Sequence, residues 1–166
     1  MGGLDEKGHI MRRKDREIKE FDGIVNVIKK CDVCRVALND DGYPYIVPLN
    51  FGMKAEGGQI ILYFHGAGEG KKYELIRKDN RAGFEMDCSH KLIADKEACS
   101  CTMQYESVAG RGRIEIVPEE EKYDALRVLM KQYHEEDFSF PGEAVKGTTV
   151  MKLIVEQVSG KRNIRR

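Results

Sequence analysis

The sequence lacks an excess of charge of either sign, and it lacks long apolar runs. Its 166 residues include 28 basic and 28 acidic side chains, so the formal net charge is zero. This balance gives no overall field that would attract nucleic acid or an anionic membrane, and neither is an expected partner. The apolar run at residues 60–64 is far too short to span a bilayer. The opening residues, MGGLDEKGHI, contain no apolar signal-peptide core, which favours a cytoplasmic location.

Cysteine is sparse and odd in number, with five residues in the chain. An odd count without a secretory signal argues against a disulfide framework. The Cys31-x-x-Cys34 spacing leaves two interpretations open: half of a metal site or a redox pair, or two unrelated reduced thiols. Cys99 and Cys101 are too close together for the usual zinc spacing. The cysteines therefore predict no metal site.

Alternating and helical patterns predict a mainly β (α+β) fold. Period-two apolar runs predict six strands, at residues 33–38, 43–51, 59–64, 82–87, 102–117 and 150–158. Helical spacing predicts three helices, at residues 23–30, 71–78 and about 118–134. Because few helices separate the strands, an antiparallel sheet or a small barrel is expected rather than parallel winding. The polar residues 1–12 are expected to form a flexible extension, and residues 13–166 a single domain.

Glycine and proline mark the expected turns and irregularities. Asp41-Gly42 predicts a hairpin turn, and Pro44 and Pro48 predict an edge or a register break in the strand that follows. Gly110 and Gly112 predict a bulge within the long strand that contains them. Ser159-Gly160 is expected to end the last strand. Residues 88–100 are expected to form a loop or lid, and residues 135–147 another loop.

One stretch has the composition of a phosphate cradle. His65 ends an apolar run, a glycine-rich turn covers residues 66–70, and Lys71 and Lys72 open a helical pattern. Helix N-termini offer unpaired N–H groups and positive potential, lysines add charge, and glycines let the backbone approach closely. A solvated lysine pair is the alternative interpretation. Arg111 and Arg113 share one face of their strand and could likewise meet a phosphate or simply face solvent.

Several motifs, taken together, resemble one known superfamily. They are Gly42-Tyr43-Pro44-Tyr45, Val47-Pro48-Leu49-Asn50-Phe51-Gly52, Leu62-Tyr63-Phe64-His65-Gly66-Ala67, Gly70-Lys71-Lys72, Tyr105-Glu106-Ser107-Val108 and Gly112-Arg113. In this order and spacing they resemble the flavin-binding split-barrel superfamily of pyridoxamine 5′-phosphate oxidase, and its 5-nitroimidazole-resistance (Nim) branch in particular. The resemblance covers residues 11–162.

The resemblance implies a six-stranded split β-barrel with about three peripheral helices, which forms a homodimer with FMN at the interface. It implies that Lys71 binds the phosphate, that His65 is the catalytic group facing a small-molecule substrate, and that Ser107 lies near the cofactor. The implied cofactor-binding residues are Pro48, Leu49, Asn50, Phe51, His65, Gly66, Lys71, Lys72 and Ser107. The expected reaction is reduction of a small acceptor, such as a nitroaromatic compound, by an FMN-dependent oxidoreductase.

The chain also departs from the oxidase itself. Gly70 replaces the arginine that precedes the phosphate-binding lysine there, and the C-terminal Trp and Arg pattern that recognises pyridoxal is absent, because the chain has no Trp. Oxidation of pyridoxamine phosphate is therefore not expected. FAD could replace FMN. Two other interpretations stay open: a haem-binding split barrel with His65 as the iron ligand, or a non-enzymatic flavin- or metal-binding sensor in which Cys31 and Cys34 act as a switch.

Overall fold

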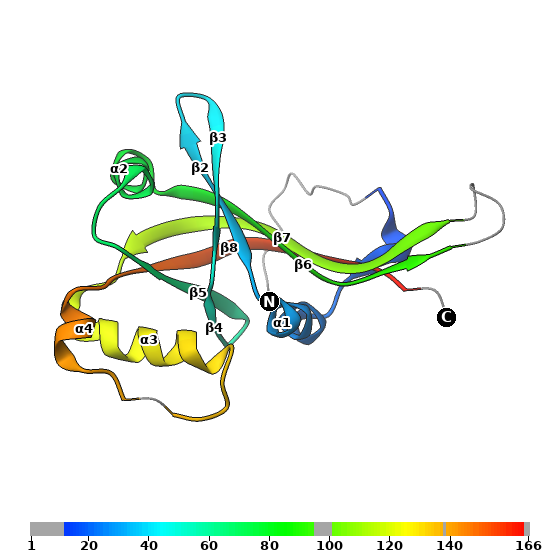
Figure 1. Ribbon diagram of the computed structural model, residues 1–166. Helices are drawn as coiled ribbons and strands as arrows, with labels where there is room; N and C mark the ends of the chain where they lie inside the picture. The colour runs from blue at the N-terminus through cyan, green and yellow to red at the C-terminus, as the bar shows by residue number, and fades with distance from the viewer. Residues whose placement is uncertain (1–11, 95–100, 138, 165–166) are drawn as a thin grey trace.

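The computed structural model describes residues 12–94, 101–137 and 139–164. The chain forms one large antiparallel sheet with helices around it (Figure 1). In chain order the elements are η1 (Lys14–Arg16), β1 (Glu17–Ile18), α1 (Phe21–Lys30), β2 (Cys34–Asp40), β3 (Tyr43–Leu49), β4 (Gly52–Glu56), β5 (Gln59–Gly66), α2 (Lys71–Lys78), β6 (Arg81–Ile93), β7 (Thr102–Ile116), η3 (Glu119–Glu121), α3 (Lys122–Lys131), α4 (Gly142–Lys146) and β8 (Thr149–Asn163).

The strand order explains why the sheet forms a split barrel. It runs β3-β2-β6-β7-β8-β5-β4, and β1 pairs with β8 outside this path. The two strands at the ends, β3 and β4, follow one another in the chain and are joined only by Asn50 and Phe51. This short link brings the two edges of the sheet together, so the sheet must curl. We refer to the junction of β3 and β4 as the seam.

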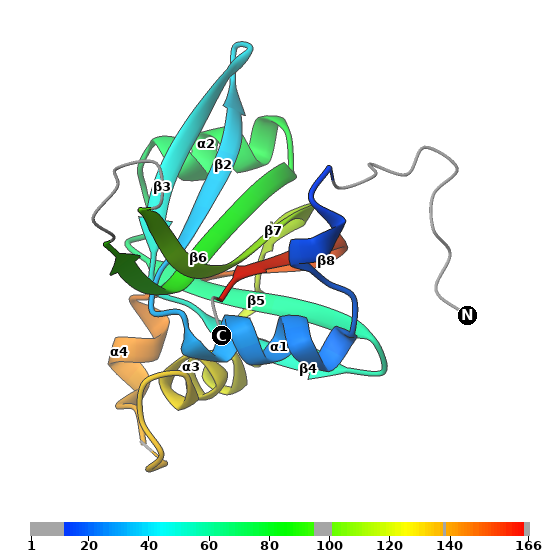
Figure 2. The same ribbon diagram turned by 90° about the vertical axis from the view of Figure 1, so that its right-hand side faces the viewer.

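The core fills the inside of the curled sheet. Large side chains from several strands, among them Phe51, Phe64 and Met86, are fully buried there. The amphipathic helix α1 adds four buried aliphatic residues to the same cluster. Figure 2 shows α2 beside the β2–β3 hairpin and α1 across the opposite end. A smaller cluster, which includes Leu126 and Val150, packs α3 and α4 against the sheet.

The predicted fold class is confirmed, and all six predicted strands are present. The observed sheet has two further strands, β1 and β4. The strand β4 was not predicted, because it is short and carries Lys54 and Glu56 on its exposed side. The helix at residues 71–78 has the predicted bounds, whereas the short helix α4 was predicted as loop.

Turns and irregularities follow the local residue chemistry. Asp41 and Gly42 have positive φ angles of 50° and 88° and form the tight β2–β3 turn, as predicted. Pro44 and Pro48 lie on β3, the edge strand, where a missing N–H disrupts no ladder. The β7–β8 register shifts between Arg111 and Gly112, which is the predicted bulge.

Two predicted interruptions are wrong. The expected loop at residues 88–100 is strand as far as Ile93, because β6 resumes pairing with β7 after a bulge between Cys88 and Lys91. The expected turn at Ser159-Gly160 is also strand, and these residues pair with Ala109 and Val108. Residues 95–100 and nearly all of the predicted N-terminal extension lie outside the described residues. Of the described helices, none has the length and apolar character needed to cross a membrane.

Candidate functional site

The start of α2 forms a cradle around Gly66. A Cβ atom on Gly66 would lie 2.8 Å from the Tyr73 hydroxyl and 3.3 Å from Lys72 Nζ, so both groups approach the glycine backbone closely. Lys72 Nζ also lies 4.5 Å from the centre of the Tyr73 ring. Gly70 precedes the helix with a φ of 124°, which favours glycine at this position. The N–H groups of Lys71 and Lys72 begin the helix, where an α-helix provides no internal acceptor for them.

The Tyr73 hydroxyl is the unusual group in this cradle. Tyr73 is 1% exposed, and its hydroxyl has no hydrogen-bond partner among the described residues. Burial raises the pKa of Tyr73, so the group is a neutral donor at physiological pH. Buried polar groups in native proteins are nearly always hydrogen-bonded. The Tyr73 hydroxyl is therefore a buried donor beside Gly66 that no described residue pairs.

Lys71 points away from this cradle. Its ammonium group forms an ion pair with Asp40 and lies 5.3 Å from the centre of the Tyr45 ring, on the β2–β3 hairpin. Its hydrogen bond to Asp40 raises the pKa of Lys71. The two lysines therefore serve different surfaces, because adjacent residues on a helix point about 100° apart. Of the predicted phosphate-binding pair, Lys72 is the one that borders Gly66.

His65 lies at the exposed end of β5, directly before Gly66. Its neighbours Phe64 and Gly66 face the inside of the sheet, so the imidazole faces outward. Its partner on β8 is Val150. The predicted catalytic histidine is thus adjacent to the cradle and open to a small molecule.

The predicted residues at the seam serve mainly to hold the barrel together. Phe51 is fully buried, and its N–H donates to the Tyr133 hydroxyl at 2.9 Å. That hydroxyl donates in turn to the Asp32 carbonyl at 2.8 Å. The Asn50 amide donates to the Asp32 carbonyl at 3.2 Å and contacts the Tyr133 hydroxyl at 3.3 Å. The Asn50 amide and the Phe51 N–H therefore already have partners in this chain, whereas Leu49 before them is half-buried.

Pro48 and Ser107 share the outer face of the sheet. Pro48 pairs with Arg35 across β2–β3. The Arg35 guanidinium lies 2.9 Å from Asp87, and Asp87 pairs with Ser107. Ser107 lies far from the cradle, however. On β8 its partner, Lys161, and the partner of His65 are eleven residues apart, or about 35 Å of extended strand.

Three of the cysteines lie in the core. Cys31, Cys34 and Cys88 are buried free thiols. The Cys31 thiol donates to the Val27 carbonyl at 3.3 Å, and the Cys88 thiol lies 4.0 Å from the same oxygen. Burial raises the pKa of Cys31 and of Cys34 far above the usual thiol range, which makes both poor metal ligands and nucleophiles. Within the described residues, no three His, Cys, Asp or Glu side chains are grouped as a metal site.

Comparisons with known proteins agree with this architecture. The family model described as pyridoxamine 5′-phosphate oxidase matches residues 21–162. The chain belongs to this family. A Bacteroides thetaiotaomicron protein, provisionally assigned to 5-nitroimidazole antibiotic resistance, is 34% identical, with a TM-score of 0.77 over 88% of this chain and 86% of that one. No curated protein matches the chain.

Two solved structures of lower sequence identity share the fold. The flavocytochrome Anf3 of Azotobacter vinelandii is 18% identical, with a TM-score of 0.78 over 96% of this chain and 75% of that one. An FAD- and haem-binding protein of Mycobacterium smegmatis is 17% identical, with a TM-score of 0.76 over 90% and 74%. The predicted membership of the flavin-binding split-barrel superfamily, with a strong match to a Nim-type protein, is thereby confirmed.

The family assignment can be tested against the residues present. A flavin phosphate requires cations and hydrogen-bond donors, and the Gly66 cradle supplies the Lys72 ammonium, the Tyr73 hydroxyl and the first N–H groups of α2. The residues fit such a group. The sequence analysis missed Tyr73 and Tyr133 because both occupy apolar helical positions that predict packing. Only the structure reveals their hydroxyl environments.

Proposed function

We propose that this chain is a flavin-dependent oxidoreductase that holds FMN in the Gly66 cradle and reduces a small acceptor such as a nitroaromatic compound. The observation that carries the proposal is the buried, unpaired Tyr73 hydroxyl beside Lys72 and Gly66. A phosphate oxygen would give that hydroxyl an acceptor, and the phosphate charge would be balanced by Lys72. The identity of 34% to a protein assigned to nitroimidazole resistance supports the same class of acceptor.

The edge strand β3 connects the start of α2 with the seam. Lys71, the first residue of α2, places its ammonium group 5.3 Å from the centre of the Tyr45 ring, and Pro48 lies three residues further along β3. That separation is about 10 Å, which suits a molecule with a phosphate at one end and a ring system at the other. Since Pro48 cannot donate a ladder hydrogen bond and β3 has no neighbour on its far side in the strand order, a flat ring can lie against this edge.

His65 is proposed as the proton donor to the acceptor. FMN, when bound, supplies the electrons, and the protein supplies placement and protons. The imidazole is exposed and directly precedes Gly66 on β5, but it lies on the opposite face of the strand from the cradle, so it would meet the acceptor outside the cradle. Histidine is suited to proton transfer near neutral pH. Lys71, held by Asp40 in this structure, could turn toward the phosphate as a second cation.

A homodimer would complete the site. Ser107 cannot reach the cradle of its own chain, since it lies at the other end of the sheet from His65. A second copy that presented its outer face to the first could bring Ser107 to the flavin. A ring exposed along β3 would also need a cover to exclude water.

A haem site is the second candidate, because the exposed His65 could ligate iron and two relatives with this fold are named for haem as well as flavin. The absorption spectrum of the purified protein separates the two. We expect the paired visible bands of oxidised flavin, whereas a Soret band would favour haem.

The assignment of the cradle is tested by titrating the apoprotein with FMN and following the flavin fluorescence. Lys72→Ala should weaken binding by about tenfold or more, because it removes a charge-assisted hydrogen bond worth about 1.5–3 kcal/mol. Lys78→Ala is the matched control, since Lys78 lies at the far end of the same helix and pairs with Asp41. Equal affinities for all three proteins would contradict the cradle.

A further inference from the structure

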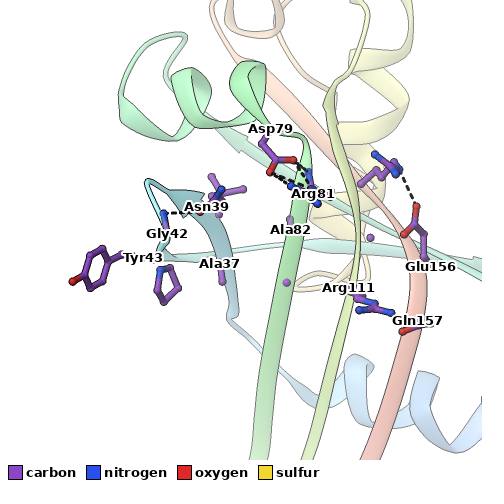
Figure 3. A pocket seen from close by; sticks show the side chains of 15 residues that line it. Ala37, Asn39, Gly42, Tyr43, Asp79, Arg81, Ala82, Arg111, Glu156 and Gln157 are labelled. Carbon is purple, nitrogen blue, oxygen red and sulfur yellow. Dashed lines mark hydrogen bonds and ion pairs between the residues drawn. The ribbon is translucent and has the colours of Figure 1, made fainter. Parts of the chain in front are cut away.

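A groove of about 840 Å³ lies on the outer face of the sheet, away from the Gly66 cradle (Figure 3). Its floor lies on β2 and β6, where side chains are small, because Ala37 on β2 pairs with Gly83 on β6. Gly83 pairs in turn with Arg111 on β7, which borders the floor. Tyr43 and Pro44 on the β2–β3 hairpin line one side. The volume lies within the range of about 300–1,000 Å³ that is typical of small-molecule sites.

Gly83 keeps the groove open, although the fold does not require a glycine there. A Cβ atom at this position would meet only the Gly110 carbonyl at 3.8 Å and the Ala37 Cβ at 3.9 Å. Both are ordinary van der Waals contacts. A β-branched residue would normally be favoured on a strand. A side chain at position 83 would fit the backbone but would fill the floor of the groove.

Three arginines surround this flat floor. Arg81 pairs with Arg113 in the β6–β7 register, so their side chains stand next to each other above Gly83 and Arg111. Arg81 is held by Asp79 at 2.7 Å, and Arg113 by Glu156 at 3.0 Å. Figure 3 places Arg111 beside Gln157.

The charge of the groove favours an anion. Its lining contains three arginines and two carboxylates, which leaves one net positive charge. The hydrogen bond from Arg81 holds the pKa of Asp79 well below its usual range, so this carboxylate is ionised at neutral pH. Arg81 is 73% exposed and Arg113 is 55% exposed. Each guanidinium carries five N–H donors, so donors remain for a ligand while both ion pairs stay in place.

We propose that this groove binds a small planar aromatic anion. The ring would lie on Ala37 and Gly83, where no side chain stands in its way, and the carboxylate, sulfonate or phosphate would meet the planar guanidinium groups of Arg81 and Arg113. Pro44, which pairs with Asn39 on the groove face of the hairpin, supplies an apolar edge. This site goes beyond the proposed function: Arg111 is four residues from Ser107 on β7, about 13 Å along the strand, and the Gly66 cradle does not contribute to the groove.

Two matched fluorescent probes test the proposal. The first is 8-anilinonaphthalene-1-sulfonate, an anion with a planar naphthalene ring, and the second is N-phenyl-1-naphthylamine, its neutral counterpart. We expect the anionic probe to saturate at one molecule per chain and to bind about tenfold more tightly than the neutral one, a difference of about 1.4 kcal/mol. Equal affinity for the two probes would overturn the role of the arginines.

Variants locate the bound probe. Gly83→Val should fill the floor, and Arg81→Gln should remove one anion contact; each should weaken binding of the anionic probe about tenfold. Ala109→Val is the control, because Ala109 is a small exposed residue on the same face but outside the groove. Unchanged affinity in both groove variants would overturn the proposal. So would conversion of a dimer to a monomer by Gly83→Val in sedimentation velocity, since the groove would then be an interface between copies.

Discussion

At the scale of single residues, the direction of a side chain decides its role more than its type does. The sequence predicted a phosphate-binding pair of lysines and favoured Lys71, which the structure turns toward Asp40. Lys72 and Tyr73 face Gly66 instead. A sequence pattern gives the helix and its start, yet the rotamer of Lys71 depends on Asp40 and Tyr45, which lie on a distant hairpin.

Replacement of Tyr73 by Phe should affect stability and affinity in opposite directions. The change removes a buried hydroxyl that lacks a partner, so the ligand-free protein should be unchanged or stabilised by about 1–2 kcal/mol in urea unfolding. The same change removes a donor to the phosphate, so FMN affinity should fall several-fold. A loss of stability without a loss of affinity would show that the hydroxyl is satisfied by a buried water instead.

At the scale of elements, the end of α3 holds the seam of the barrel closed. Gln132 donates to the Ile28 and Cys31 carbonyls at the end of α1, at 3.3 and 2.9 Å. Tyr133 bridges the Asp32 carbonyl and the Phe51 N–H. The link between β3 and β4 is therefore positioned by a helix that follows it in the chain by some eighty residues.

Tyr133→Phe should destabilise the protein by about 1–3 kcal/mol, because the Phe51 N–H loses its acceptor in a half-buried position. Urea unfolding measures the effect. Tyr123→Phe on α3, the helix just before Tyr133, is the control, since Tyr123 is 40% exposed and makes an edge-on ring contact with Phe140 that the change preserves. Equal effects of the two substitutions would mean that the seam does not depend on the Tyr133 hydroxyl.

A buried ion pair fastens α1 to β7 and predicts a dependence on pH. Glu106 is 4% exposed and accepts from Lys30 and from Ser89, the latter at 3.0 Å. Burial raises the pKa of Glu106, but the hydrogen bonds from Lys30 and Ser89, together with the charge of Arg162, outweigh it, and the pKa is lowered overall. The stabilisation is therefore present above the unfolded-state pKa of about 4.3 and is lost as the pH falls through the native value.

Glu106→Gln should accordingly cost about 1–3 kcal/mol at pH 7, and the difference from the parent protein should shrink as the pH falls below about 4. Urea unfolding at a series of pH values gives both numbers. Glu115→Gln, an exposed residue on the same strand that pairs with Lys152, should change stability by less than about 1 kcal/mol. A Glu106 effect that stayed constant with pH would rule out the ion pair as its cause.

Elements with strong local signals were predictable, and those defined by distant partners were not. Asp41-Gly42 fixes its hairpin through backbone preference alone. Gly160 was interpreted as a turn residue, yet it lies in the middle of a strand. A glycine is needed there because a Cβ atom would come within 3.0 Å of Ile18 and Ile24. Its glycine serves close packing of β1 and α1 on β8, and no local pattern distinguishes that use from a turn.

At the scale of the whole molecule, the predicted site residues divide between two regions of one chain. Gly66, Lys71 and Lys72 gather at α2, whereas Ser107 lies far along the sheet on its outer face. The resemblance placed all of them around one cofactor. The observed separation and the expected shared site are compatible if each flavin lies between two copies of the chain. Lys72 would then come from one copy and Ser107 from the other.

Mixed dimers test this arrangement directly. Lys72→Ala and Ser107→Val homodimers would each carry one defect in every site, and both should bind FMN weakly. A heterodimer of the two variants would contain one doubly defective site and one intact site if Ser107 acts on the partner's flavin. Co-expression with two different affinity tags allows the heterodimer to be purified, and FMN titration should then fill about half of its sites with the affinity of the parent protein. If Ser107 acted within its own chain, every site of the heterodimer would keep one defect and no affinity would return.

A parent protein that sedimented as a monomer at micromolar concentration would exclude the arrangement altogether, because Ser107 and His65 are separated by about 35 Å of extended strand in a single chain.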